Sequence, residues 1–298
     1  MNINGIKIDD TFAEAFSMVA TRLIITAASL KWARIAAEGA TGFATSVIAC
    51  GCEAGIEREW SAEETPDGRV GVSILLFTMK KDRLATQIKK RVGQCILTCP
   101  TTACYAGLYT DEMLPLGKTL RYFGDGWQIS KMIQERRYWR IPVMEGEFLC
   151  EETTGVQKAI GGGNFLVLAS TPEQALAATE CAVNAIAPLP DVILPFPAGI
   201  ARSGSKVGSK YKALLASTNE EFCPTLKNQV RSCLDEKTGS VLEIIIDGMS
   251  RAAVEKATRV GIEAICALGA ESGVHRISAG NYGGRLGKHH FKLHEIMV

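Results

Sequence analysis

The sequence predicts an α+β fold of two related lobes, each an antiparallel sheet with helices packed on it, built from ferredoxin-like split βαβ elements. Strand–helix units occur in both halves of the chain, but strands and helices do not alternate regularly, as a parallel α/β sheet would require. The length of 298 residues fits two domains of roughly 150 residues each. We therefore expect one lobe over residues 1–150 and a second over residues 151–298.

The first half is expected to hold one helix followed by a strand–helix unit. Residues 11–14 read Thr-Phe-Ala-Glu, which is the pattern of a capping box, and apolar residues recur at helical spacing from Phe12 to Leu23. Residues 69–78 are apolar and β-branched, which predicts a strand. Residues 82–92 have the apolar stripe and basic face of an amphipathic helix.

The second half repeats the strand–helix pattern. The sequence Thr-Pro-Glu-Gln at residues 171–174 combines an N-cap with a Pro at the first helical position, and predicts a helix to about residue 187. Residues 240–247 form a predicted strand, and Ser250 is placed to cap a helix that runs to about residue 267. Residues 274–278 then read as a returning strand.

Charge and hydropathy argue against two classes of partner. The 33 Lys and Arg against 32 Asp and Glu leave a net charge of +1, without the basic surplus that nucleic-acid binding usually requires. The longest apolar run, near residues 23–28, is too short to cross a bilayer and lacks the flanks of a signal peptide. We expect a cytoplasmic protein that binds neither nucleic acid nor membrane.

The ten cysteines are expected to be reduced thiols, because disulfide frameworks belong mainly to short secreted chains. Their spacing does not form two Cys-x-x-Cys pairs, and the histidines near the end of the chain lie too far away in sequence to imply a shared site. No metal site is therefore expected. The residues considered are Cys50, Cys52, Cys95, Cys99, Cys104, His289, His290 and His294.

The sequence contains no complete motif for nucleotide binding or for an α/β-hydrolase. Residues 199–206 resemble a P-loop, but a serine separates the second glycine from the lysine. Residues 161–164 read Gly-Gly-Gly-Asn and lack the spacing of a dinucleotide-binding loop, and no Gly-x-Ser-x-Gly nucleophile elbow occurs. NTP hydrolysis, a Rossmann fold and an α/β-hydrolase fold are all disfavoured.

Several loops rich in glycine and small polar residues remain as candidate binding segments. Glycine permits close backbone approach, and Ser, Asn and Lys donate hydrogen bonds, so such loops suit polyanionic or amide-rich ligands. The alternative for each loop is a tight turn between strands. The loops are residues 41–46, 123–126, 161–164, 203–210 and 278–287.

Glu243 is the most informative carboxylate. Strand alternation places it on the same face as Val241 and Ile245, so we expect it to be half-buried. Burial without a cationic partner raises the pKa of a carboxyl group and makes its proton available near neutral pH. The alternative is an outward-facing glutamate in a salt bridge.

Seven segments, taken together and in order, closely resemble the formylmethanofuran:tetrahydromethanopterin formyltransferase family. The resemblance covers essentially the whole chain. Its most specific parts are Ser-Lys-Val-Gly-Ser-Lys at residues 205–210 and Ser-Ala-Gly-Asn-Tyr-Gly-Gly at residues 278–284. Residues 109–120 and 129–137 are the least typical, and no role is carried onto them. The segments are residues 10–16, 40–43, 64–69, 123–126, 145–148, 205–210 and 277–281.

The resemblance implies an enzyme that moves a formyl group between the amine of methanofuran and a ring nitrogen of tetrahydromethanopterin. It implies no metal or prosthetic group, since both coenzymes are substrates. It also implies a homotetramer with the coenzymes bound between subunits. Two alternatives remain open: a non-catalytic pterin-binding protein, and a scaffold subunit of a larger formyl-transferring or hydrolysing complex.

Formyl transfer between amines passes through a tetrahedral adduct, which needs a proton shuttle and a site for an oxyanion. Glu243 is the predicted shuttle. A covalent route through Cys95 or Cys99 is less favoured, because neither has a histidine partner evident in the sequence. Cationic and polar side chains of the loops are predicted to bind the anionic coenzymes. They are Ser203, Ser205, Lys206, Ser209, Lys210, Asn164, Asn281 and Arg285.

Overall fold

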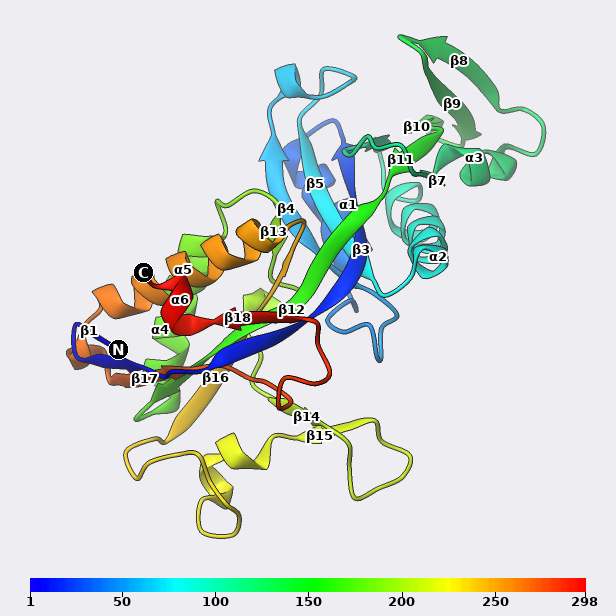
Figure 1. The fold of residues 1–298 in the computed structure, drawn as a ribbon. Coiled ribbons are helices and arrows are strands. Elements are labelled where there is room, and N and C mark those ends of the chain that lie inside the picture. The colour runs from blue at the N-terminus through cyan, green and yellow to red at the C-terminus, as the bar shows by residue number, and fades with distance from the viewer. The chain divides into compact units, whose positions relative to one another are not determined.

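The computed structural model describes all residues 1–298, and the chain divides into two compact units (Figure 1). The terminal unit comprises Met1–Ser17 and Ile160–Val298, and the central unit comprises Met18–Ala159. Each unit has its own buried apolar core and combines β-strands with helices. The predicted α+β class is confirmed.

In the terminal unit, strand β12 lies between β16 and β17 and is antiparallel to both. Strand β2 continues the sheet beside β17, in a parallel pair. A separate two-stranded sheet pairs β14 with β15. The strands of this unit are β1 (Asn2–Ile3), β2 (Ile6–Ile8), β12 (Gln157–Ala169), β13 (Val192–Ile193), β14 (Ser205–Val207), β15 (Ala216–Thr218), β16 (Ser240–Gly248), β17 (Val274–Ser278) and β18 (His289–Lys292).

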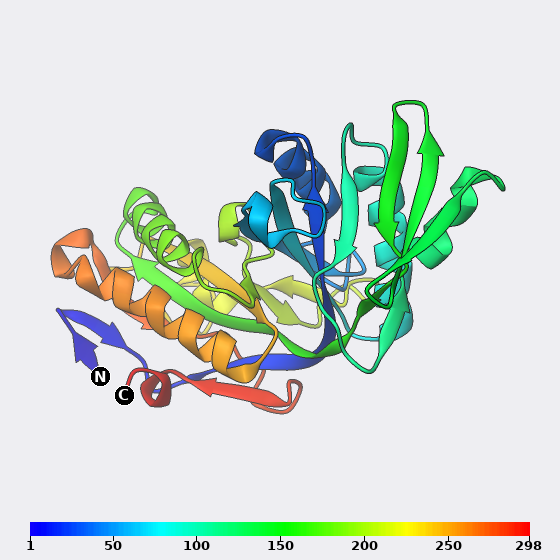
Figure 2. The ribbon, with the colours of Figure 1, turned by 90° about the horizontal axis from the view of Figure 1, so that it is seen from above.

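Two long helices, α4 (Pro172–Ile186) and α5 (Arg251–Ala267), pack side by side on one face of this sheet (Figure 2). Both begin as predicted: the Thr171 hydroxyl accepts a hydrogen bond from the Gln174 N–H at 3.3 Å, and the Ser250 hydroxyl accepts one from the Ala253 N–H at 3.1 Å. The predicted strands at residues 240–247 and 274–278 are confirmed as β16 and β17. A short helix, α6 (Leu293–Ile296), follows β18.

The register of the three central strands decides which side chains face away from the helices. Leu166 of β12 is paired with Glu243 of β16 on one side and with Ser278 of β17 on the other. Side chains of directly paired residues share a face, and their chain neighbours point to the opposite one. The neighbours Phe165 and Ile244 are fully buried in the core with α4 and α5. Glu243 therefore projects from the face that the helices leave open.

In the central unit, seven strands form one sheet in the order β4, β5, β3, β6, β10, β9, β8, in which only β6 and β10 are parallel. The predicted strand at residues 69–78 and helix at residues 82–92 are confirmed as β5 and α2. The elements are β3 (Phe12–Thr26), α1 (Leu30–Thr41), β4 (Glu53–Trp60), β5 (Gly71–Thr78), α2 (Lys81–Arg91), β6 (Ala103–Ala106), β7 (Met113–Pro115), α3 (Gly117–Leu120), β8 (Ile129–Ile133), β9 (Arg136–Val143), β10 (Gly146–Glu151) and β11 (Thr153–Gly155).

The predicted helix over residues 11–23 is wrong, because Phe12–Thr26 forms the long strand β3, which contributes residues to both units. The strand is buried on both faces along much of its length, so apolar residues occupy positions that also satisfy a helical period. Glu14, the presumed partner in the capping box, instead accepts hydrogen bonds from a distant segment of the chain. Tertiary contacts here override the local signal.

Candidate active site

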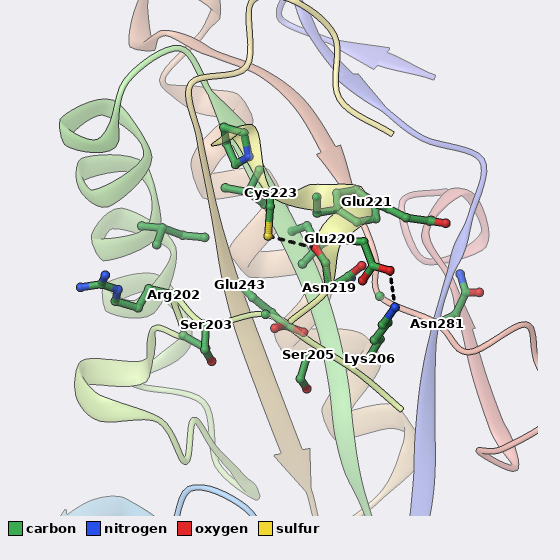
Figure 3. Close-up of a pocket in the computed structure, with 18 of the residues that line it drawn as sticks. Arg202, Ser203, Ser205, Lys206, Asn219, Glu220, Glu221, Cys223, Glu243 and Asn281 are labelled. Atoms are coloured by element: carbon green, nitrogen blue, oxygen red, sulfur yellow. Dashed lines mark hydrogen bonds and ion pairs between the residues drawn. The ribbon is translucent and has the colours of Figure 1, made fainter. Parts of the chain in front are cut away.

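A polar cavity of about 630 Å³ lies in the terminal unit, on the face of the sheet that carries Glu243 (Figure 3). It is lined by Leu166 together with residues 201–207, 219–225, 241–243 and 280–282. Five of the predicted site residues meet in this cavity. They are Ser203, Ser205, Lys206, Glu243 and Asn281.

The backbone on both sides of Glu243 is fixed. Its N–H donates to the carbonyl of Ala201 at 2.9 Å, and the Ala201 N–H donates to the Glu243 carbonyl at 2.8 Å. This bridge brings the start of the 201–207 segment against β16, and so places Ser203 and Ser205 beside the same cavity.

The Glu243 side chain is half-buried, as the alternation of strand β16 predicts. No hydrogen bond or ion pair engages its carboxyl group, so the alternative of a salt-bridged surface glutamate does not describe it. Burial raises the pKa of Glu243 to about 7. A carboxyl group of this kind exchanges protons readily at neutral pH.

Lys206 forms an ion pair with Glu220 inside the cavity, as the dashed line in Figure 3 marks. The hydrogen bond from Lys206 lowers the pKa of the Glu220 carboxyl group. The lysine is therefore not a free cation in this structure, and an anionic ligand would meet both charges.

Asn164 does not line the cavity, although its neighbour Gly280 does. Its side chain is only 6% exposed, and both of its amide atoms are used on Gly280. The Gly280 N–H donates to Oδ1 at 2.7 Å, and Nδ2 donates to the Gly280 carbonyl at 3.2 Å. Asn164, a residue of strand β12, thus holds the backbone of the segment that contains Gly280.

Three other predicted site residues also lie outside the lining: Ser209, Lys210 and Arg285. The Ser209 hydroxyl accepts a hydrogen bond from the Tyr211 N–H at 3.0 Å, and Lys210 and Arg285 are exposed. Their binding roles stay predictions.

Sequence reasoning missed the 219–225 segment and Tyr282, both of which line the cavity. The 219–225 segment carries no motif, and nothing in the sequence pairs Glu220 with Lys206. Tyr282 lies in the Gly-Asn-Tyr-Gly-Gly stretch at residues 280–284, and its place within this stretch is the sequence signal that could have identified it.

All ten cysteines are free thiols, and no group of three or more His, Cys, Asp or Glu side chains is arranged to hold a metal ion. None of the helices combines the length and the apolar run that a membrane crossing needs.

Comparison with known proteins identifies the family. A family model described as formylmethanofuran-tetrahydromethanopterin formyltransferase matches residues 1–143, and a second, described as its proximal lobe, matches residues 146–296. The chain belongs to this family. Every residue that lines the cavity falls within the proximal-lobe match.

Individual members of the formyltransferase family agree over the full length. A formylmethanofuran–tetrahydromethanopterin formyltransferase from Methylococcus capsulatus is 65% identical, with 100% of both chains covered. The crystal structure of a formyltransferase/hydrolase complex from Methylorubrum extorquens, solved with methylofuran, contains a chain that matches with a TM-score of 0.97 and 51% identity, covering 100% of this chain and 99% of that one. The formyltransferase from Methanosarcina barkeri matches with a TM-score of 0.94 and 47% identity, covering 99% of this chain and 100% of that one.

Proposed function

We propose that this chain is a formyltransferase that moves a formyl group between formylmethanofuran and tetrahydromethanopterin in one-carbon metabolism. The names of its full-length relatives support this substrate pair. The observation that carries the proposal in the chain itself is Glu243, a half-buried carboxyl group with a pKa near 7 and no partner, in a cavity lined by polar loops. Both coenzymes act as substrates, and the proposal assigns no prosthetic group.

In the proposed mechanism the attacking amine adds directly to the formyl carbon and forms a tetrahedral adduct. Glu243 accepts the proton that the attacking nitrogen loses and delivers a proton to the departing nitrogen. A carboxyl group with a pKa near the working pH performs both transfers, because neither protonation state is strongly disfavoured. Hydroxyl groups of Ser203 and Ser205 supply hydrogen bonds toward the oxyanion of the adduct.

The remaining predicted residues are assigned to binding. Lys206 and Asn281 line the cavity and are proposed to bind anionic and amide groups of the coenzymes, with Glu220 released from Lys206 when an anion binds. Ser209, Lys210 and Arg285 are proposed to contact parts of the coenzymes that extend beyond the cavity. Asn164 is proposed to act through Gly280.

A formyl-cysteine intermediate is less favoured by the structure's chemistry. Cys95 and Cys99 belong to the central unit and do not line the cavity that holds Glu243. Burial raises the pKa of the Cys99 thiol, and the charge of Glu145 raises it further. A raised pKa lowers the thiolate fraction, and the thiolate is the nucleophile.

The test is a formyl-transfer assay with the wild-type protein and Glu243→Gln. The glutamine keeps the size of the side chain but cannot shuttle a proton, so we expect kcat to fall by about a hundred- to ten-thousand-fold with KM nearly unchanged. Retention of more than about a tenth of the wild-type kcat, which is less than about 1.4 kcal/mol of transition-state stabilisation, would refute the role of Glu243. An inactive wild-type protein would favour the non-catalytic pterin-binding alternative.

We also propose that the protein works in the cytoplasm as a homotetramer, with coenzymes bound between subunits. Several large apolar side chains in and next to the cavity-lining segment are exposed, which is typical of a surface that another chain covers: Val207, Tyr211, Leu214 and Leu215. The relative from Methylorubrum extorquens is named as a subunit of a formyltransferase/hydrolase complex, so a mixed assembly is the alternative.

Size-exclusion chromatography with light scattering on the purified chain, with activity measured across the peak, distinguishes these assemblies. We expect activity to coincide with a tetramer. A monomer that gains activity only when other subunits are added would support the mixed assembly instead.

A further inference from the structure

Glu14 is a buried carboxylate whose charge is balanced by backbone groups alone. Its side chain is fully buried, and no cation pairs with it. Four N–H groups donate to its two oxygens: Tyr282 at 2.7 Å and Gly284 at 2.8 Å to Oε2, and Leu286 and Gly287 each at 2.6 Å to Oε1. Burial acts to raise the pKa of Glu14, but these four hydrogen bonds lower it below its ordinary value. The carboxylate is thus charged and fully satisfied.

The segment that surrounds Glu14 is shaped for this contact by its glycines. Gly283 and Gly284 have φ of +78° and +73°, a region that residues with a side chain rarely adopt. A Cβ atom at Gly287 would lie 2.5 Å from the Ala15 carbonyl oxygen and 2.8 Å from Cγ of Glu14. The turn wraps the carboxylate closely enough that a side chain at Gly287 would push it away.

The same turn carries Tyr282 into the wall of the cavity that contains Glu243. The Tyr282 ring packs against Phe16, another residue of strand β3, with ring centroids 6.2 Å apart. Glu243 and Tyr282 both line this cavity; burial raises the pKa of the Tyr282 phenol, and the charge of Glu243 raises it further. Glu14 fixes the backbone of Tyr282, and Tyr282 borders the proposed proton shuttle.

We propose that Glu14 is a positioning residue: its buried carboxylate fixes residues 282–287 and thereby holds Tyr282 in the wall that encloses Glu243. This inference rests on the proposed function of the cavity. It assigns a role in the site to a residue that does not line the cavity and that local sequence patterns place in a helix cap.

Glu14→Gln is the direct test. The glutamine offers one carbonyl oxygen to the four N–H donors and turns its amide N–H groups toward the others, so the turn loses its fixed shape. Water then reaches Glu243, and its pKa falls below the value of about 7 that burial gives it. We expect kcat/KM to fall at least about tenfold and the carboxyl limb of its pH profile to move to lower pH.

The pKa of Glu243 is also measured without turnover, by infrared titration of its carboxyl band, which is identified by its loss in Glu243→Gln. This measurement separates the two proposals, because it decides the role of Glu14 even if the wild-type protein transfers no formyl group. In a double-mutant cycle, Glu14→Gln should add less than about threefold to the loss caused by Tyr282→Ala, since both changes act through one side chain.

Glu57→Gln is the matched control. Glu57 is a buried carboxylate of the central unit that accepts hydrogen bonds from Arg22 at 2.6 Å and Ser73 at 2.8 Å, and it does not line the cavity. We expect it to lower the melting temperature without moving the pKa of Glu243. If the Glu14→Gln protein does not fold, Gly283→Ala is the alternative variant that disturbs the same turn. No atom lies within 4 Å of the added Cβ, so the substitution strains the turn only through the positive φ at this position.

The inference is overturned by an unchanged pKa of Glu243 in the folded Glu14→Gln or Gly283→Ala protein. It is overturned equally if Glu57→Gln shifts that pKa as much as Glu14→Gln does, or if the losses from Glu14→Gln and Tyr282→Ala multiply in full. A lowered pKa with a reduced joint effect supports it.

Discussion

Glu243 makes the free energy of unfolding depend on pH in a way that its replacement removes. The folded protein holds this carboxyl group at a pKa of about 7, above the ordinary value of 4.5. A group whose pKa is raised by folding contributes its full stability below the unfolded pKa and loses it as pH rises through the folded pKa. As pH rises from 4.5 through 7, the wild-type protein should therefore lose stability that the Glu243→Gln protein keeps.

We predict that Glu243→Gln is more stable than wild type by about 3 kcal/mol at pH 8, and that this difference disappears below about pH 4.5. Denaturant unfolding at a series of pH values measures it, and the other titrating groups cancel because both proteins carry them. A constant difference across this range would mean that Glu243 is solvated and unsuited to the role proposed for it.

Lys206 and Glu220 allow a prediction with opposite signs for two neighbouring substitutions. If Lys206 binds an anionic coenzyme group, Lys206→Ala removes a charge-assisted hydrogen bond worth about 1–3 kcal/mol and should raise the KM of one coenzyme about 5- to 150-fold. Glu220→Gln frees the lysine from its ion pair, so it should lower the same KM. Steady-state assays that vary each coenzyme in turn measure both effects. If both substitutions changed this KM in the same direction, the ion pair between Lys206 and Glu220 would have a structural role and not a binding one.

At the scale of elements, local sequence signals predicted helices α4 and α5 correctly because both the cap and the apolar stripe of each helix are visible in the sequence. The helices α4 and α5 begin at caps that the sequence displays, Thr171 and Ser250, and their apolar stripes have a single period. The prediction for residues 11–23 was wrong because strand β3 is buried on both faces, which removes the alternation of apolar and polar residues that identifies a strand. The capping-box pattern depends on four adjacent residues only. It contains no information about the hydrogen bonds that Glu14 accepts from residues 282–287.

The candidate site was predictable where a residue's own strand determines its environment, and not where distant segments meet. Alternation alone placed Glu243 on a half-buried face. The ion pair between Lys206 and Glu220 depends on the fold of segments that carry no regular period. The predicted loop at residues 161–164 is wrong, because these residues lie within strand β12, which pairs with β16. Whether the amide of Asn164 faces a ligand or Gly280 is decided only by tertiary structure.

At the scale of the whole molecule, the sequence predicted two lobes but not how residues are shared between compact units. The predicted division into residues 1–150 and 151–298 stays a prediction about the two halves of the sequence. The compact units differ from these halves, because Met1–Ser17 packs with Ile160–Val298. The first residues join that unit through β2 beside β17 and through Phe12–Ala15 beside β18. Contacts between residues so far apart in the sequence cannot be predicted from local sequence patterns.

This sharing of residues sets an order of events during synthesis on the ribosome. The central unit is continuous along the chain, so all of its residues are available for folding once residue 159 has left the exit tunnel. The terminal unit cannot be complete at that point, because the four donors to Glu14 come from residues 282–287, which are made well after residue 159. Until then the Glu14 carboxylate stays in water, where it needs no partner. The cavity, whose lining includes residues 280–282, therefore forms only after all residues of the central unit have been made, and a nascent chain that stalls between residues 159 and 280 has no complete site.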